Sequence, residues 1–139
     1  MKLVRKMLGH AMTMAPHAVA IGLKFEDGED GRGRMSVAWR EDLVADPDSG
    51  VIASGVVTAL LDHCCGLAVN ATGKISFPIA TLDLRIDYMR PAAPRSGLTA
   101  EAHCYKMTRS IAFVRAEAWD VDRSDLVATA QAAFILNRG

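Results

Sequence analysis

The longest apolar run of the chain lies near its middle and has the period of an α-helix. From Ile52 to Gly66 nearly every residue is apolar or small, and one carboxylate, Asp62, interrupts the run. At about 100° per residue, the bulky side chains share one face, and Asp62 shares the other with small residues. The bulky residues are Val57, Leu60, Leu61, Cys64, Leu67 and Ala68; the small ones are Gly55, Thr58, Ala59 and Gly66. The pattern predicts one core helix, capped by Ser54, with a shallow track along Asp62.

The rest of the chain mostly alternates apolar and polar residues, which is typical of half-buried β-strands. Two strands are expected before the helix, as a hairpin around the turn at 27–31, and four after it. The predicted strands are 19–26, 34–40, 81–88, 98–105, 112–119 and 126–134. A short helix is expected at 3–14, closed by Pro16, and a loop at 41–50. One apolar helix among so many strands predicts an α+β fold, with an antiparallel sheet curled around the helix.

Composition limits the partners that this chain can have. Its 139 residues are 50% hydrophobic and 23% charged, with a formal net charge of +0. These values predict a single domain over residues 1–139, without the basic excess that nucleic-acid binding requires. No apolar run approaches the roughly 20 residues of a membrane span, and no signal peptide is evident. We therefore expect a cytoplasmic protein with no nucleic-acid or membrane partner.

The three cysteines indicate neither a disulfide framework nor a metal site. Cys64 and Cys65 are adjacent, Cys104 lies far along the chain, and no metal-type spacing is present. Free buried thiols in a reducing compartment are the expected state. We expect no metal and no cofactor.

Asp62 is the residue that most calls for a chemical explanation. Aspartate is a poor helix former, and an unpaired buried carboxylate is costly. Its small-residue stripe would let a ligand approach closely. In the alternative interpretation, Asp62 and His63 lie on a solvent-facing stripe, and Thr58 or a neighbouring strand donates a hydrogen bond to Asp62.

Two segments carry a resemblance to a known family. Residues 55–62, GVVTALLD, resemble an apolar helix that carries a Leu-x-Asp motif, and residues 81–92, TLDLRIDYMRPA, resemble a strand ending in Arg-Pro-Ala. Residues 126–130 resemble the final strand of the same family. Over about residues 51–134 the chain is similar to hotdog-fold acyl-CoA thioesterases of the phenylacetate-degradation type, which are related to hydroxybenzoyl-CoA thioesterases.

The resemblance implies hydrolysis of an acyl-CoA thioester, with roles for particular residues. Asp62 would act as general base or as nucleophile, and the backbone N–H of Ser54 or Gly55 would bind the oxyanion. The residues implied in substrate or coenzyme A binding are Ala53, Gly66, Thr81, Asp83, Arg90, Arg109 and Ser110. Relatives build their sites between subunits, so the resemblance also implies a homodimer or homotetramer.

The chain departs from the family pattern at the start of the helix. The family's His-Gly-Gly is Ala53-Ser54-Gly55 here, so an imidazole is missing. His63 follows Asp62 directly, but adjacent helix residues point about 100° apart, and we do not expect it to replace that imidazole. The alternative function is a non-catalytic module that binds acyl-CoA or an acyl carrier. A hydratase or dehydratase ranks third, because its usual histidine signature is absent.

Overall fold

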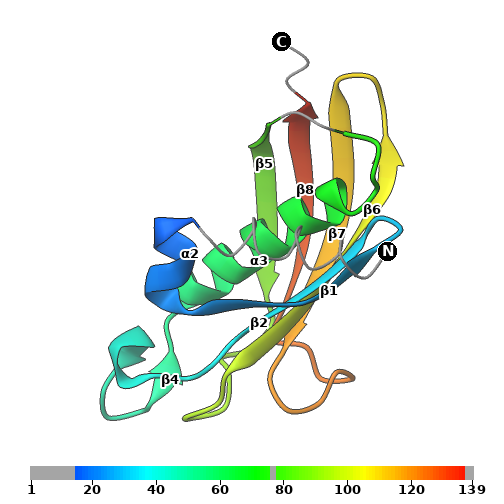
Figure 1. Cartoon of the computed structure of the whole chain (residues 1–139). Helices are drawn as coiled ribbons and strands as arrows, with labels where there is room; N and C mark the ends of the chain where they lie inside the picture. The colour runs from blue at the N-terminus through cyan, green and yellow to red at the C-terminus, as the bar shows by residue number, and fades with distance from the viewer. Residues whose placement is uncertain (1–14, 76–77, 137–139) are drawn as a thin grey trace.

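The computed structural model describes residues 15–75 and 78–136 (Figure 1). The helix expected at 3–14 lies outside the described residues. The elements are α2 (Pro16–Ile21), β1 (Leu23–Glu29), β2 (Arg32–Val37), η1 (Glu41–Leu43), β3 (Val44–Asp46), β4 (Val51–Ile52), α3 (Ser54–Asn70), β5 (Ile79–Tyr88), β6 (Leu98–Met107), β7 (Ile111–Trp119) and β8 (Ala128–Leu136).

The described chain has one large antiparallel sheet with the helix α3 lying across one face of it (Figure 1). The sheet has six strands in the order β1-β2-β6-β7-β8-β5, and β3 and β4 form a separate two-stranded sheet. The predicted α+β hotdog fold is therefore confirmed, including the four strands that follow the helix. In this order β5 is an outer strand of the sheet, although it comes directly after α3 in the chain.

The core between α3 and the sheet is built from large side chains on the helix and small ones on the strands. The bulky helix face predicted from the sequence is buried, as are Val56, Cys65 and Val69. The buried alanines of the facing strands are Ala100, Ala102, Ala112, Ala116, Ala118, Ala128, Ala130 and Ala132. Gly33 of β2 marks the closest approach, since a Cβ there would lie 2.8 Å from Cγ of Leu67. Small strand residues thus allow α3 to lie close to the sheet.

The prediction of a strand through residues 19–21 is wrong, because these residues belong to α2. Pro16 occupies the first turn of this helix, and Gly22 ends it with φ of 76°. Proline suits the first turn because its missing N–H would have no helical partner there, and glycine adopts the left-handed conformation without strain. Val19 is 59% exposed, so it does not belong to the core face that alternation suggested.

Four further predictions, of boundaries, a cap and a face, are wrong. The core helix begins at Ser54, since Ile52 pairs with Val44 in the small sheet; its N-cap is Ala53, without a side-chain hydrogen bond. The strand predicted at 34–40 ends at Val37. The register of β5 against β8 shifts between Thr81 and Asp83, and this bulge leaves Leu82 57% exposed instead of on the core face.

Candidate active site

Asp62 lies on α3, two turns beyond the start of the helix, and its partner comes from the sheet. The side chain is half-buried, and the Thr81 hydroxyl donates a hydrogen bond of 2.7 Å to Asp62 Oδ1. Thr81 precedes the bulge of β5. The carboxylate borders a shallow hollow of about 230 Å³, lined by Asp62, His63, Gly66, Asn70, Ile79, Thr81 and Phe134. Asp62 therefore has an oriented oxygen and an open approach, as a general base or nucleophile requires.

The N-terminus of α3 offers hydrogen-bond donors in its first turn. Ser54 and Gly55 are exposed and occupy the first two helical positions, whose N–H groups have no acceptor within a helix. A Cβ at Gly55 would meet no atom within 4 Å. The helix dipole favours negative charge at this end. The first turn can therefore receive an anionic oxygen.

Tyr88 ties this first turn to β5, a contact that the sequence did not reveal. Its hydroxyl oxygen lies 3.3 Å from the Ser54 carbonyl oxygen and is hydrogen-bonded to the Thr58 hydroxyl. Thr58 also donates to the Ser54 carbonyl, at 3.1 Å. Thr58 thus bonds to Ser54 and Tyr88, whereas Asp62 receives its hydrogen bond from a strand. The available signal was an aromatic hydroxyl at the end of an alternating strand.

His63 lines the same hollow as Asp62, although the two side chains leave the helix in different directions. Its ring centroid lies 6.4 Å from that of His17, which α2 supplies. Burial lowers the pKa of His63, the Asp62 carboxylate opposes that shift, and His17 adds to it. The pair could not be foreseen, because α2 was not expected as a helix.

Comparison with known proteins agrees with this geometry. The family description "Thioesterase superfamily" matches residues 49–127, more than half of the chain. The chain belongs to the thioesterase superfamily. It is 31% identical over 94 residues to a Halobacterium salinarum protein named "Putative esterase"; the match covers 66% of this chain and 61% of that relative's length.

Solved structures of several similar proteins have the same fold as this chain. A Pseudomonas aeruginosa protein has a TM-score of 0.84 at 28% identity, covering 94% of this chain and 96% of that one. A variant of the phenylacetic acid degradation protein PaaI of Thermus thermophilus has a TM-score of 0.74 at 28% identity, covering 87% and 98%. E. coli PaaI, at 18% identity and a TM-score of 0.82, covers 96% and 93% and shows the fold alone. The predicted resemblance to phenylacetate-degradation proteins is confirmed.

In this superfamily member, four of the predicted binding residues lie near the helix or its partner strand. Thr81 and Gly66 lie at the Asp62 hollow. Ala53 lies directly before the first turn of α3, and Asp83 is exposed just beyond the β5 bulge. The structure thus brings Thr81 and Gly66 to Asp62 and leaves the other two beside the site.

Arg109 and Ser110 form the turn between β6 and β7, and both are exposed. The Ser110 carbonyl accepts a hydrogen bond of 2.8 Å from the Leu136 N–H, and Leu136 pairs with Ile79 at the start of β5. The structure therefore places this turn at the end of the sheet where β5 begins, without joining it to Asp62.

Arg90 is engaged elsewhere. Its guanidinium donates two hydrogen bonds to Asp120, at 2.9 and 2.7 Å, and another to the Asp125 carbonyl, at 2.8 Å. The Asp120 side chain is only 2% exposed. The Arg90 guanidinium holds the pKa of Asp120 well below its usual range, and the backbone N–H groups of Ala93 and Val121 assist. These contacts give Arg90 a structural task, joining the loop after β5 to the loop after β7.

Residues 15–75 and 78–136 contain neither a metal site nor an activated cysteine. No cluster of three or more His, Cys, Asp or Glu side chains there has the arrangement to hold a metal ion. Burial raises the pKa of the Cys64 thiol to about 12 and that of Cys65 well above its usual range, so neither is a ready nucleophile. No helix among these residues is both long and apolar enough to cross a membrane.

Proposed function

We propose that this protein hydrolyses an acyl-CoA thioester to the free acid and coenzyme A. The observation that carries the proposal is Asp62, a half-buried carboxylate oriented by Thr81 and bordering a hollow. The open first turn of α3 supplies the second requirement, a seat for the oxyanion. The names of superfamily relatives, an esterase and phenylacetic acid degradation proteins, support the same reaction class.

The chemistry needs little more than these two elements. Asp62 either takes a proton from a water molecule that attacks the thioester carbonyl, or attacks that carbonyl itself. Negative charge then develops on the carbonyl oxygen, which the N–H of Ser54 or Gly55 stabilises. The C–S bond breaks, and coenzyme A departs as a thiolate. On the general-base route the thiolate takes up the proton that Asp62 accepted from water; on the nucleophilic route water then hydrolyses the anhydride between the acyl group and Asp62, which releases the free acid.

The spacing within one helix limits how these groups act together. Gly55 and Asp62 lie seven residues apart, which is about 10 Å of helical rise. A carboxylate that attacks the carbonyl directly and an amide that binds its oxygen must each lie about 3 Å from the reacting atoms. One α3 helix therefore does not supply both groups to the same carbonyl by direct attack.

We propose that two copies of the chain complete each site, with Asp62 from one and the first turn of α3 from the other. The exposed outer strand β5 supports a homodimer, because its unpaired edge and its exposed Leu82 and Tyr88 need covering. In that arrangement the neighbour also contributes the segment 109–110 to substrate binding, whereas Thr81 comes from the chain that supplies Asp62. Pairing of dimers would give a homotetramer.

The alternative function is a module that binds acyl-CoA or an acyl carrier without hydrolysis. The observation in its favour is Ala53, which has no side-chain polar group where the family pattern has histidine. It predicts binding without turnover.

The test of hydrolysis is loss of thioester absorbance with short, medium, long-chain and aromatic acyl-CoAs. Asp62→Asn should lower kcat at least about 100-fold, because the base or nucleophile is lost. Asp87→Asn is the matched control, because it removes an exposed carboxylate of β5 that does not border the hollow. This variant should retain activity within about two-fold. Binding by the wild type without turnover of any substrate would favour the binding module instead.

Subunit complementation tests the shared site. Asp62→Asn and Gly55→Leu chains should each be inactive alone, the second because a side chain fills the open space at the helix start. Mixed dimers would regain one intact site of two, giving about a quarter of wild-type activity after random reassortment. Absence of recovery, or a monomeric mass in light scattering, would contradict a site built from two copies.

A further inference from the structure

The outer face of the sheet, opposite α3, carries two neighbouring rows of charged side chains. Strand register aligns Arg34, Glu101 and Glu117 in one row across β2, β6 and β7. Two residues along, Arg32, His103 and Arg115 form the next row on the same strands. Side chains of both rows alternate with buried residues, so they point away from the core and from Asp62.

The first row is neutralised within the chain. The Glu101 carboxylate forms ion pairs with Arg34 and Arg123, with N···O distances of 2.6 and 2.9 Å. Arg123 forms a further ion pair with Glu117 at 3.0 Å. The Arg123 guanidinium lies over the Trp119 ring, 4.7 Å from its centroid. Both carboxylates of this row are therefore already paired.

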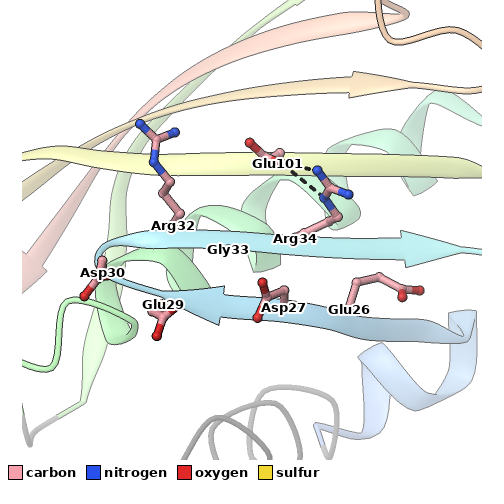
Figure 2. Close-up of a pocket in the computed structure, with 8 residues that line it drawn as sticks. All are labelled: Glu26, Asp27, Glu29, Asp30, Arg32, Gly33, Arg34 and Glu101. Carbon is pink, nitrogen blue, oxygen red and sulfur yellow. Dashed lines mark hydrogen bonds and ion pairs between the residues drawn. The ribbon is translucent and has the colours of Figure 1, made fainter. Parts of the chain in front are cut away.

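The second row is less compensated, although Glu29 of β1 is in register with Arg32. Among residues 15–75 and 78–136, neither Arg32 nor Arg115 forms an ion pair. Figure 2 shows Arg32 extending over β6, away from the acidic side chains of β1, while Arg34 turns to Glu101. The row places one arginine on each side of His103, and neither β6 nor β7 contributes a carboxylate to it.

A hollow lies over the second row, and one of its arginines is held in place by an aromatic ring. A hollow of about 170 Å³ lies over it, lined by Arg32, Glu101, Ala102, His103, Arg115, Ala116, Glu117 and Arg123. The Arg115 guanidinium is held over the Tyr105 ring, 4.1 Å from its centroid. Strand register places the imidazole of His103 between Arg32 and Arg115, and burial and both arginines lower its pKa.

We propose that Arg32, His103 and Arg115 form an anion-binding site, separate from the Asp62 site, for a ligand that carries a diphosphate group. The two arginines lie two strand spacings apart, about 10 Å, with the imidazole midway. A single carboxylate meets one arginine, whereas linked phosphates present oxygens to both guanidinium forks and to the imidazole. Because the row lies on the opposite face of the sheet, the ligand would not contact Asp62.

Inorganic pyrophosphate is the probe, titrated into the full chain and followed by calorimetry and by the NMR signal of His103. Binding should raise the pKa of His103, because the added negative charges favour the imidazolium. Arg32→Gln and Arg115→Gln should each weaken binding about 10-fold, the loss of one charge-assisted contact.

Arg85→Gln is the matched control. Arg85 of β5 lies on the same face as Arg115, and Gln131 of β8 is in register with both. Unlike Arg115, Arg85 forms an ion pair with Asp87. It should leave pyrophosphate binding unchanged. The proposal is overturned if pyrophosphate does not bind, if the His103 signal does not respond, or if Arg85→Gln weakens binding as much as Arg115→Gln.

Discussion

Removing the charge of Asp120 should destabilise the fold strongly without acting on the Asp62 site. Asp120 accepts hydrogen bonds from both terminal nitrogens of Arg90, from Ala93 N–H at 2.8 Å and from Val121 N–H at 2.6 Å. Asp120→Asn keeps the size of the side chain but leaves the guanidinium without its counter-charge. Since the Asp120 side chain is almost fully buried, we expect a loss of about 2–4 kcal/mol in the free energy of unfolding. For a chain of this length, about 3 kcal/mol corresponds to a Tm lower by about 10 °C.

Asp125→Asn is the control on the same arginine. Asp125 Oδ1 lies 3.2 Å from Arg90 Nε, but its side chain is 68% exposed. An exposed ion pair contributes at most about 1 kcal/mol. Urea unfolding of both variants at pH 7 measures the difference. Equal stability of the two would refute the assignment of Arg90 as a structural anchor, and a raised KM for acyl-CoA in Arg90→Gln at unchanged stability would restore it as a binding residue.

The same pair fixes the sign of a pH dependence. The pKa of Asp120 is lowered in the folded state, so its contribution to stability is complete above the unfolded value near 4 and declines as the pH falls toward the folded value. The stability difference between wild type and Asp120→Asn should therefore narrow by about 1 kcal/mol between pH 7 and pH 3. A difference that widens in acid would contradict the direction of the shift.

Two other predictions concern packing and accessibility. Gly33→Ala should lower the free energy of unfolding by about 1–3 kcal/mol in urea titrations, because its Cβ would overlap a leucine of α3, whereas Gly55→Ala, with open space, should leave stability equal or slightly higher. Equal losses in both would contradict the close approach. A thiol reagent at pH 8 should modify half-buried Cys104 in the native protein, and Cys64 and Cys65 only on unfolding. Three rapidly labelled thiols under native conditions would contradict that order.

The parts of the fold that depend on long periodic patterns were predictable from the sequence. The bulky stripe through Leu60, Leu61 and Cys64 predicted the buried face of α3, and the alternation after it predicted four strands. Short elements could not be predicted in the same way. Pro16 and Gly22 carry the signals of a helix start and end, but the alternation after Pro16 was compatible with a strand, and six residues are too few for the period to decide.

The candidate site was predictable in its helix and unpredictable in its partners. Asp62 stood out as a carboxylate in an apolar helix, because that is a local property. Its bond to Thr81, the contact of His63 with His17 and the engagement of Arg90 by Asp120 all join segments far apart in sequence. Such pairings depend on strand order and on the β5 bulge, neither of which hydrophobic periodicity encodes.

The buried alanines of the strands that face α3 restrict which substitutions the core can accept. Its side chains are already close to minimal in volume, and any larger one would lift the helix and strain every contact along it. Shortening these alanines therefore opens no chamber, and only the larger helix side chains, such as Leu60, have volume to give up. Exposed positions such as Leu82 and Met89 differ, because a substitution there alters the surface of the chain and leaves its scaffold intact.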